Sequence, residues 1–427
     1  VPFFVPSYQW WESPFYGIGL RIYDMLAGRF GFGKSSHVSA SEMLAALPSL
    51  NPEGLLGGTK YYDGQFDDAR LAINLATTAA EHGATLVNYA RVEGFSKDSS
   101  GHILGVEVQE LESQESFLCR AQVVVNATGP FADSLRQIDD PTAKKIIAPS
   151  QGVHLVLDHS FLPNDAAIMV PHTDDGRLLF AIPWHGVAVI GTTDTAIDES
   201  VLEPKAQEEE IDFILENANR YLKRRATRSD VRSVFTGIRP LVQVEKGEST
   251  AALSREHAIL INPESGLLTV AGGKWTTYRK MAEDVVDQAA TLAGLQDVPC
   301  PTRRLKIHGH HALGDSRDAL AIYGSDARKV RSLIGLDVRL GKKVHEKLPL
   351  VAAEVIWATR FEMARRVEDV LARRTRCLLL DARAAAEAAP RVADLMAQEL
   401  GFDSNWVKAE VEAFQQLAQD YLPSKLT

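Results

Sequence analysis

The stretch GLLTVAGGKWTTYRKMAEDVVDQAATLAG, residues 266–294, is the clearest structural signal in the sequence. Its apolar run at 267–271 has the composition of a buried strand, and Gly272-Gly273 follows as a turn. After the turn, apolar side chains recur at helical spacing until Gly294, a typical helix end. A strand, a glycine turn and a helix in this order predict a unit of an α/β fold.

The glycine turn is also a candidate ligand site. Only glycine tolerates the close backbone approach that such a turn provides. The helix that follows presents free N–H groups and the positive end of its dipole to an anion or a polarised ligand. Lys274, Thr276 and Thr277 add donors at the same point. The alternative is that Gly272 and Gly273 serve only the close packing of strand and helix.

A second α/β unit lies earlier in the chain. Residues 67–83 carry apolar side chains at helical spacing, and VVVNATG, residues 123–129, reads as a strand that ends in small residues. Because α/β folds bind ligands at the carboxyl edge of the sheet, Thr128 and Gly129 are candidate contacts. A tight turn without a ligand is the alternative.

The remaining segments differ in pattern from these two units. Short apolar runs with turn signals predict an inserted antiparallel sheet with one helix near 207–223. Toward the C-terminus, apolar positions at helical spacing predict a helical domain. We therefore expect a mixed α/β (α+β) protein with five parts: an aromatic-rich segment (1–60), a first α/β part (61–135), an inserted sheet domain (136–253), a return to the α/β domain (254–295) and a helical domain (296–427).

The composition excludes several classes of protein. The 427 residues include 46 Lys and Arg against 56 Asp and Glu, a formal net charge of −10. This balance argues against a nucleic-acid partner, which requires clustered cations. Cys119, Cys300 and Cys377 are too widely spaced for a disulfide framework or a Cys-type metal site. No apolar run is long enough to span a membrane as a helix.

Two patterns match known sites only in their letters. Residues 28–35 fit G-x-x-x-x-G-K-[ST], but a phosphate-binding P-loop follows a buried strand, and the segment before residue 28 looks helical. We interpret it as a basic surface loop. His308, His310 and His311 have no partner ligand at metal-site spacing, so we interpret them as part of a solvated loop and predict no metal.

The aromatic N-terminal segment has two interpretations. A packed hydrophobic lid is favoured because the stretch lacks the Lys/Arg face of typical interfacial helices. The alternative is a surface that touches lipid headgroups. The aromatic residues concerned are Phe3, Phe4, Tyr8, Trp10, Trp11, Phe15 and Tyr16.

An arginine in the inserted domain is a candidate phosphate ligand. Arg239 follows a strand-like stretch and precedes Pro240, which restrains the backbone. A guanidinium held in this way can clamp a phosphate with its planar fork. A surface salt bridge is the alternative, and spacing alone does not reject it.

Taken together and in order, these segments resemble the FAD-dependent glycerol-3-phosphate dehydrogenases. The resemblance covers nearly the whole chain, and GGKWTTYR and IGTTDT are specific to this group. The matching pieces are YYDGQFDDARL (61–71), VVVNATGPFADSLR (123–136), PSQGVHLVL (149–157), AIPW (181–184), VIGTTDT (189–195), FTGIRPLV (235–242), LSREH (253–257), VAGGKWTTYRKMAED (270–284), WATRFEMARRVEDVLARRTR (357–376) and LLLDARAAAEAAPRV (378–392).

The resemblance implies a reaction and a set of site residues. Family members oxidise sn-glycerol 3-phosphate to dihydroxyacetone phosphate, pass the electrons to a quinone and lie peripherally on the cytoplasmic or mitochondrial inner membrane. By resemblance, Arg239 and Lys274 are active-site groups that hold the phosphate and stabilise developing negative charge. His154 matches a substrate-pocket position and is a candidate base, with a satisfied core histidine as the alternative. The implied FAD contacts are Thr128, Gly129, Gly272, Gly273, Thr276 and Thr277, and a homodimer is a possible assembly.

One family element is missing. The opening strand, G-x-G-x-x-G turn and helix that bind the ADP half of FAD are not found in the sequence, which begins at Val1 rather than Met. We therefore expect an incomplete FAD-binding Rossmann-like domain, truncated by about a hundred residues, that binds FAD weakly or not at all alone.

Three alternatives remain open. A glycerol-3-phosphate oxidase shares the fold and the substrate but passes electrons to oxygen. An inactive truncated fragment, acting as a substrate-binding or assembly module, fits the missing turn. An amino-acid oxidase-like relative would not depend on a substrate phosphate.

Overall fold

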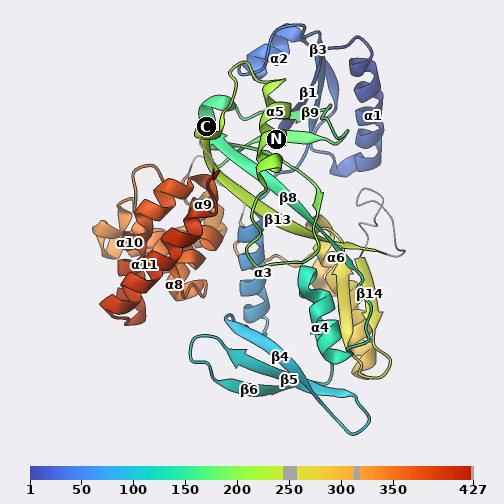
Figure 1. The fold of residues 1–427 in the computed structure, drawn as a ribbon, viewed down its shortest axis with the longest axis vertical. Coiled ribbons are helices and arrows are strands. Elements are labelled where there is room, and N and C mark those ends of the chain that lie inside the picture. The colour runs from blue at the N-terminus through green and yellow to red at the C-terminus, as the bar shows by residue number, and fades with distance from the viewer. Residues whose placement is uncertain (244–256, 312–317, 425–427) are drawn as a thin grey trace.

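The computed structural model describes residues 1–243, 257–311 and 318–424. The expected boundary at 253/254 and most of the LSREH motif lie outside the described residues. Within them, the chain forms three sheets and a helical C-terminal domain (Figure 1). This confirms the mixed α/β fold that the sequence predicts.

The largest sheet joins the N-terminal segment to the inserted domain. Its order is β12-β8-β11-β10-β9-β1-β3-β2, and β13 also pairs with β8. Neighbouring strands are antiparallel except β1 and β9, which run parallel. The strands are β1 (Pro2–Ser7), β2 (Ser36–Ser39), β3 (Gly57–Tyr62), β8 (Ile147–Asp158), β9 (Ala167–Val170), β10 (Leu179–Trp184), β11 (Val187–Gly191), β12 (Thr195–Ala196) and β13 (Val231–Val242). The segment expected at 1–60 therefore contributes β1 and β2, and the start of β3, to the sheet of the inserted domain.

The two faces of this sheet are covered differently. On one face, α2 (Ala40–Ala46) and α5 (Glu208–Asn219) close a continuous apolar core. Among the described elements, the other face is covered at its two ends. There α1 (Glu12–Ala27) packs on the β1 and β3 end, and α9 (Cys377–Leu380) packs on β11 through Leu380. The middle of this second face is left for a site.

The strand-turn-helix unit quoted first lies in a smaller sheet. Its order is β14-β15-β7, where β15 and β7 run parallel and β14 is antiparallel to β15. The elements are β7 (Val125–Asn126), β14 (His257–Ile261), β15 (Leu268–Gly272), α4 (Ala132–Asp139) and α6 (Tyr278–Leu292). Because β7 and β15 are parallel, the two small-residue turns predicted as ligand sites lie at the same edge of the sheet.

A third sheet, β4-β5-β6, extends from one end of the molecule (Figure 1). Its strands are β4 (Ala90–Lys97), β5 (Ile103–Glu110) and β6 (Ser116–Arg120), and it follows the helix α3 (Asp68–Glu81). The helix begins where Asp67 accepts a hydrogen bond from the backbone of Arg70, and it ends two residues before Gly83, the stop that the sequence predicts.

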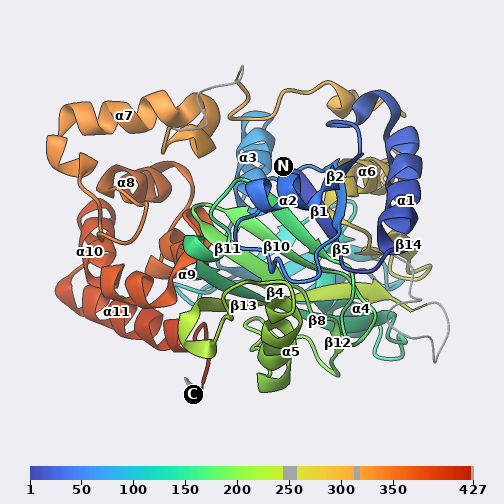
Figure 2. The same ribbon diagram turned by 90° about the horizontal axis from the view of Figure 1, so that it is seen from above.

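The C-terminal residues form a helical domain with its own core. Figures 1 and 2 both place it on the opposite side of the molecule from α1. Asp403 caps the last helix, as the sequence predicts, by accepting from the backbone N–H groups of Asn405 and Trp406. Besides α9, the helices are α7 (Ala327–Leu336), α8 (Ala352–Phe361), α10 (Ala382–Leu400) and α11 (Ser404–Gln419).

Short turns of helix connect these elements. Eight are of the 3-10 type and one is a π-helix in the part of the chain that the structure describes. They are η1 (Gly28–Phe30), η2 (Gly129–Phe131), η3 (His159–Phe161), η4 (Arg228–Asp230), η5 (Trp275–Thr277), η6 (Pro301–Arg303), η7 (Ala321–Asp326), η8 (Val338–Gly341) and the π-helical η9 (Asp369–Arg374).

The local context of residues 28–35 differs from that of a P-loop. The helix α1 precedes them and the strand β2 follows, the reverse of the order that a P-loop requires. Ser35 is anchored to Asp24 of α1 through its backbone N–H at 2.7 Å and its hydroxyl at 3.0 Å. The segment is a surface loop, which confirms the interpretation from the sequence.

Candidate active site

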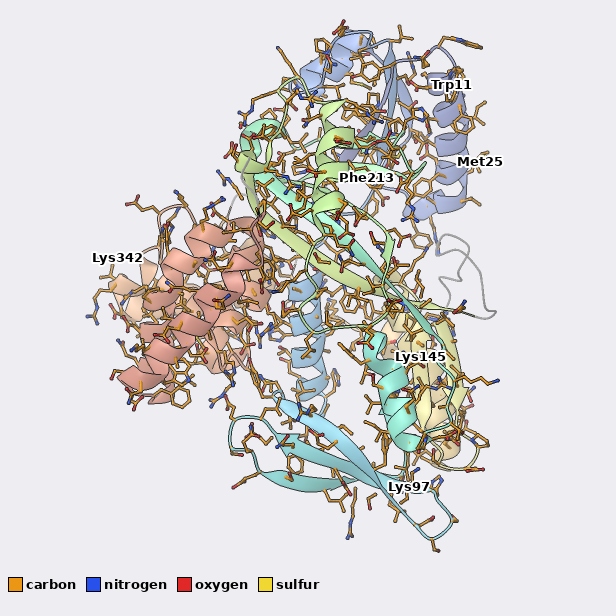
Figure 3. The ribbon with its side chains drawn as sticks, viewed as in Figure 1. Trp11, Met25, Lys97, Lys145, Phe213 and Lys342 are labelled. Carbon is orange, nitrogen blue, oxygen red and sulfur yellow. The ribbon has the colours of Figure 1, made fainter. Side chains whose placement is uncertain are left out.

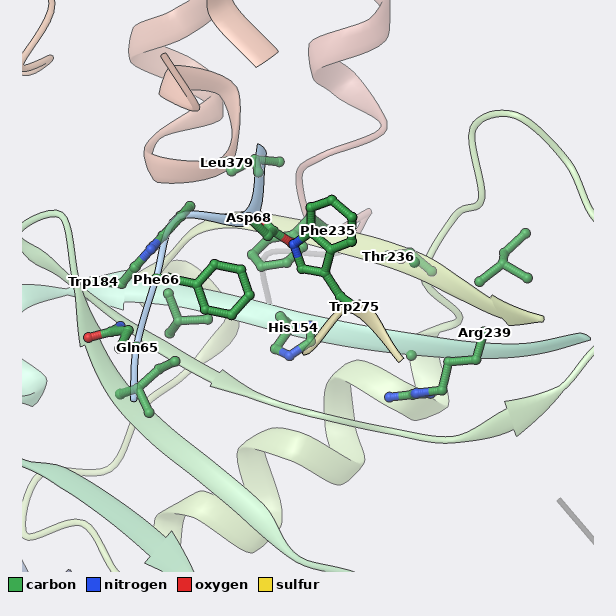
Figure 4. A pocket seen from close by; sticks show the side chains of 15 residues that line it. Gln65, Phe66, Asp68, His154, Trp184, Phe235, Thr236, Arg239, Trp275 and Leu379 are labelled. Atoms are coloured by element: carbon green, nitrogen blue, oxygen red, sulfur yellow. The ribbon is translucent and has the colours of Figure 1, made fainter. Parts of the chain in front are cut away.

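A cleft of about 580 Å³ lies on the second face of the large sheet. Its size is that of a site for a small molecule or for part of a cofactor. Strands β8, β10, β11 and β13 form its floor, and the start of α3, the turn η5 and the helix α9 form its walls (Figure 4). The lining residues are Gln65, Phe66, Asp68, Gly152, His154, Ile182, Trp184, Val189, Phe235, Thr236, Gly237, Ile238, Arg239, Trp275 and Leu379.

His154 stands at the centre of the floor. It is paired across β8 with Phe235 of β13 and with Gly191 of β11. Its ring stacks on Phe235 with centroids 4.9 Å apart and planes 11° from parallel. A Cβ at Gly191 would come within 2.4 Å of His154 Cδ2, so glycine at this position leaves room for the imidazole.

The surroundings of His154 keep its imidazole neutral. Burial, and then the charge of Arg239, lower the pKa of His154 from 6.5 to about 4. At neutral pH the ring therefore carries one N–H donor and one free lone pair, which is the form that can accept a proton. A neutral ring of lowered pKa is compatible with both interpretations from the sequence, a base and a satisfied core histidine.

Arg239 lies beside His154, and its guanidinium is held by the segment between β11 and β12. Its Nη2 donates to Thr192 Oγ1 at 3.1 Å, and its Nη1 donates to the carbonyl of Thr193 at 3.2 Å. The carboxylate of Asp194 is 3.6 Å from Nη1. A Cβ at Gly152 would lie 2.5–2.7 Å from the guanidinium atoms, so the arginine packs flat over a bare glycine. Figure 4 shows the side chain extending toward His154.

The segment Gly272-Gly273-Lys274 follows β15, and the next residue, Trp275, lines the same cleft. Gly272 and Gly273 have φ values of 73° and 82°, the left-handed region that favours glycine. The turn η5 comes between β15 and α6, so the long helix begins one turn later than the sequence predicts. Trp275 lines the cleft, while Lys274 is exposed and is not among the lining residues.

The turn formed by Thr128 and Gly129 follows β7, the strand next to β15. Asn126 Oδ1 accepts a hydrogen bond from Thr128 Oγ1 at 2.7 Å, and Asn126 Nδ2 donates to the carbonyl of Ala132 at 2.9 Å. These bonds fix the turn after β7. Gly129 has φ 58°, and a Cβ there would meet no atom within 4 Å, so its surface is open to a ligand.

The structure adds residues that the sequence did not single out. Phe235 packs on His154 and Gly152 packs under Arg239, and Trp184, Gln65 and Asp68 also line the cleft. In the sequence, these residues were marked only by lying within the motifs quoted above. The three histidines at 308–311 take no part in this cleft.

The expected solvated loop at 308–311 needs a correction. The ring of His308 is largely buried, and it bridges Glu81 Oε1, at 2.8 Å, and Asp326. These two carboxylates, 227 and 18 residues away, raise its pKa against the effect of burial. His310 and His311 are exposed. Across the residues that the structure describes, no group of three His, Cys, Asp or Glu side chains converges as a metal site.

The interpretation of the N-terminal aromatics as a packed lid is wrong for much of the segment. Phe15, Met25 and Leu26 of α1 are largely exposed, and so is Trp10 just before the helix; Leu26 keeps 82% of its surface. Figure 3 shows Met25 on the outer side of α1. Phe3, Phe4 and Tyr8 instead pack in the interior. The reason is packing: β1 lies within the large sheet and buries both of its faces, whereas α1 packs only a narrow face, through Tyr16 and Leu20. In the described residues, no helix is long and apolar enough to cross a membrane.

Comparisons with known proteins agree with this architecture. The family of FAD dependent oxidoreductases matches residues 17–279, and the C-terminal domain of alpha-glycerophosphate oxidase matches residues 268–407. A probable mitochondrial glycerol-3-phosphate dehydrogenase of Caenorhabditis elegans is 36% identical over 96% of this chain, and the chain spans 60% of that relative's length. A mitochondrial glycerol-3-phosphate dehydrogenase of Arabidopsis thaliana is 36% identical over the whole chain, which spans 73% of the relative.

A solved structure shows the same overall arrangement. It is the glycerol-3-phosphate dehydrogenase of Bacillus halodurans complexed with FAD, with a TM-score of 0.76 and 28% identity. The match covers 100% of this chain and 83% of the solved chain.

Proposed function

The chain belongs to the FAD-dependent glycerol-3-phosphate dehydrogenases, and we propose that its cleft oxidises sn-glycerol 3-phosphate to dihydroxyacetone phosphate with a quinone as the final acceptor. The observation that carries the proposal is the placement of a neutral imidazole, His154, beside a fixed cation, Arg239, on the floor of one cleft. A phosphorylated secondary alcohol needs both groups: a cation for its phosphate and a base for its hydroxyl.

The residues present fit the ring half of FAD. Gly129, Gly272 and Gly273 bring bare backbone to one edge of the small sheet, and aromatic side chains wall the adjoining cleft. Thr128, Thr276 and Thr277 supply hydroxyl groups at that edge. We propose these residues as the FAD contacts. Bound FAD would supply the acceptor for the hydride that leaves C2.

The ADP half of FAD has no matching turn in the sequence, which contains no strand followed by G-x-G-x-x-G and a helix. We therefore propose that this chain alone binds FAD weakly. A stoichiometric yellow complex of the purified chain at micromolar FAD would contradict this proposal.

The chain's own residues divide the chemistry between them. Arg239 binds the phosphate and so orients the substrate over the floor of the cleft. The neutral ring of His154 has a lone pair, on Nδ1 or Nε2, that accepts the proton of the C2 hydroxyl as the hydride leaves. Lys274, next to the cleft-lining Trp275 in the sequence, stabilises the negative charge that develops during the reaction. Trp275 from η5 and Phe235 on the floor give the cleft an apolar lining around His154.

The outer surface of α1 supports a peripheral placement on a membrane. We call it the α1 surface: Phe15, Ile18, Ile22, Met25, Leu26, Phe30 and Phe32, all at least half exposed. Arg21, Arg29 and Lys34 are exposed along the same helix and loop. Apolar side chains flanked by cations are the composition that binds anionic lipid surfaces. A mitochondrial inner or bacterial cytoplasmic membrane is the proposed location.

Turnover at saturating FAD tests the proposed function against its alternatives. Dihydroxyacetone phosphate and reduced quinone analogue formed in equal amounts would support it. Hydrogen peroxide in place of the reduced quinone would favour an oxidase. Neither product, with glycerol 3-phosphate still bound, would favour a substrate-binding module, and turnover of a substrate without phosphate would favour an amino-acid oxidase-like relative.

A further inference from the structure

The carboxylate of Glu210 is buried on the far side of the cleft floor, on the face of the large sheet that α5 covers. Side chains alternate between the two faces along β8. Gly152 and His154 line the cleft, whereas Val153 packs into the core that α5 closes. Gln151 follows the same alternation and shares the face of Val153. Glu210, in the first turn of α5, is only 5% exposed and meets the side chain of Gln151 there.

This carboxylate accepts four hydrogen bonds. Its Oε1 accepts from the hydroxyl groups of Thr193, at 2.8 Å, and Thr195, at 2.6 Å. Its Oε2 accepts from Gln151 Nε2 at 2.6 Å and from the backbone N–H of Gln207 at 2.9 Å. An ionised carboxylate has about four acceptor positions, so these donors occupy it. Glu210 therefore ties β8 and the segment between β11 and β12 to the start of α5.

Two of these partners also hold Arg239, through their backbone. Arg239 Nη1 donates to the carbonyl of Gln151 at 3.4 Å and to the carbonyl of Thr193 at 3.2 Å. Both residues thus bind Glu210 with their side chains and the guanidinium with their carbonyls. Thr193 Oγ1 also accepts from the backbone N–H of Val153 at 3.0 Å, which joins the two segments. Glu210 therefore fixes the two carbonyl groups between which the guanidinium is held.

We propose that Glu210 is a positioning residue for substrate binding, which acts through Gln151 and Thr193 to hold Arg239 in the orientation that takes the phosphate. The inference rests on the proposed function and deepens it, because Glu210 is not among the residues that line the cleft. A guanidinium that is already held in its binding geometry loses less freedom when the phosphate arrives. Affinity for glycerol 3-phosphate therefore depends on a carboxylate that never touches it.

The charge of Glu210 has the opposite effect on binding. A carboxylate behind the phosphate site repels an anionic substrate, so removal of its charge alone would tighten binding. Loss of its hydrogen bonds would instead release the two carbonyl groups and weaken binding. The direction of the change in Kd therefore distinguishes positioning from repulsion through space.

Calorimetric titration of the purified chain with glycerol 3-phosphate measures this direction. In Glu210→Gln an amide NH₂ replaces one oxygen and cannot accept a hydrogen bond. We expect the Kd to rise about tenfold, equivalent to about 1.4 kcal/mol. Glu216→Gln removes the same charge at an exposed position of α5 and should leave the Kd unchanged. An unchanged or lower Kd in folded Glu210→Gln would overturn the proposal.

A double-mutant cycle with Arg239→Ala separates positioning from a general loosening of the fold. If Glu210 acts through Arg239, Glu210→Gln raises the Kd in the unaltered chain and has no further effect in Arg239→Ala. The same factor in both backgrounds would overturn the proposal.

A milder variant serves if Glu210→Gln does not fold. Thr195→Val removes one of the four donors and keeps the shape of the side chain. We expect its Kd to rise about threefold, equivalent to about 0.7 kcal/mol, and only where Arg239 is present. An unchanged Kd in Thr195→Val would then overturn the proposal.

The outcomes distinguish this inference from the proposed function. An unchanged Kd in Arg239→Ala contradicts the phosphate role of Arg239, and with it the proposed function. A raised Kd in Arg239→Ala together with an unchanged Kd in Glu210→Gln contradicts only the positioning by Glu210.

Discussion

Arg376 of the helical domain binds Asp67 at the wall of the cleft, with Nη2 and Oδ2 2.5 Å apart. The arginine is only 1% exposed and also donates to the carbonyls of Arg373 and Arg374. Asp67 in turn begins α3 and accepts from His185 Nε2 at 3.2 Å. The residues on either side of Asp67, Phe66 and Asp68, line the cleft. The helical domain is therefore joined to the site by a buried ion pair.

Arg376→Met should destabilise the fold strongly. Removing one partner of a buried ion pair leaves the other charge uncompensated, which costs about 3–5 kcal/mol. Arg360→Met is the matched control: it breaks an ion pair to Glu399 in the same domain, but the arginine side chain there is 46% exposed, and such pairs contribute about 0–1 kcal/mol. Urea unfolding of both variants measures the difference. Equal losses of unfolding free energy in the two variants would contradict a larger contribution from the ion pair between Arg376 and Asp67.

The neutral state of His154 should appear in the pH dependence of stability. Its folded pKa, about 4, is below its ordinary value of 6.5, so the unfolded chain takes up this proton first. The stability that this difference provides is complete above about pH 6.5 and is lost as the pH falls toward 4. His154→Gln should flatten the unfolding profile in this window, whereas His159→Gln, at an exposed position, should not. A nuclear magnetic resonance titration of His154 with a midpoint near 6.5 would refute the assignment.

Gly152→Ala should weaken substrate binding without unfolding the protein. The new methyl group would lie 2.5–2.7 Å from the Arg239 guanidinium and must displace it. Charge-assisted hydrogen bonds contribute about 1.5–3 kcal/mol, so we expect a roughly ten- to hundredfold higher Kd for glycerol 3-phosphate. Gly335→Ala, in α7 with no atom within 4 Å of the new methyl, is the control. An unchanged Kd in Gly152→Ala would show that the position of Arg239 is not critical.

The α1 surface should bind anionic vesicles. Ile18→Glu with Leu26→Glu puts two carboxylates among the exposed apolar side chains, and we expect vesicle binding to be lost in a flotation assay. Leu336→Glu changes an equally exposed leucine on α7, at the far side of the molecule, and should bind as the unaltered chain does (Figure 2). Binding that survives the double substitution would place the membrane contact elsewhere.

Local sequence patterns were sufficient to predict part of the fold. The strand, turn and helix around Gly272 follow from periodicity and glycine alone, and so do the end of α3 near Gly83 and the cap of α11 at Asp403. Arg239 and His154 were found by motif, and the structure shows why they belong together: they lie on β13 and β8, which pair in register.

Contacts between residues far apart in the chain could not be predicted from the sequence, for a physical reason. The ion pair between Asp67 and Arg376 joins residues 309 positions apart, and neither carries a local signal of its partner. The parallel pairing of β1 with β9 likewise depends on tertiary packing rather than on alternation within either strand. His308 was read as solvated because its partner Asp326 lies on another turn, η7.

Calorimetric titration with glycerol 3-phosphate tests the central claim most directly: that Arg239 is the phosphate ligand of the cleft. The unaltered chain and Arg360→Met should bind with the same affinity, inorganic phosphate should compete, and glycerol should not bind. Arg239→Ala should raise the Kd at least tenfold, equivalent to about 1.4 kcal/mol. Equal affinity in Arg239→Ala and the unaltered chain would contradict the account.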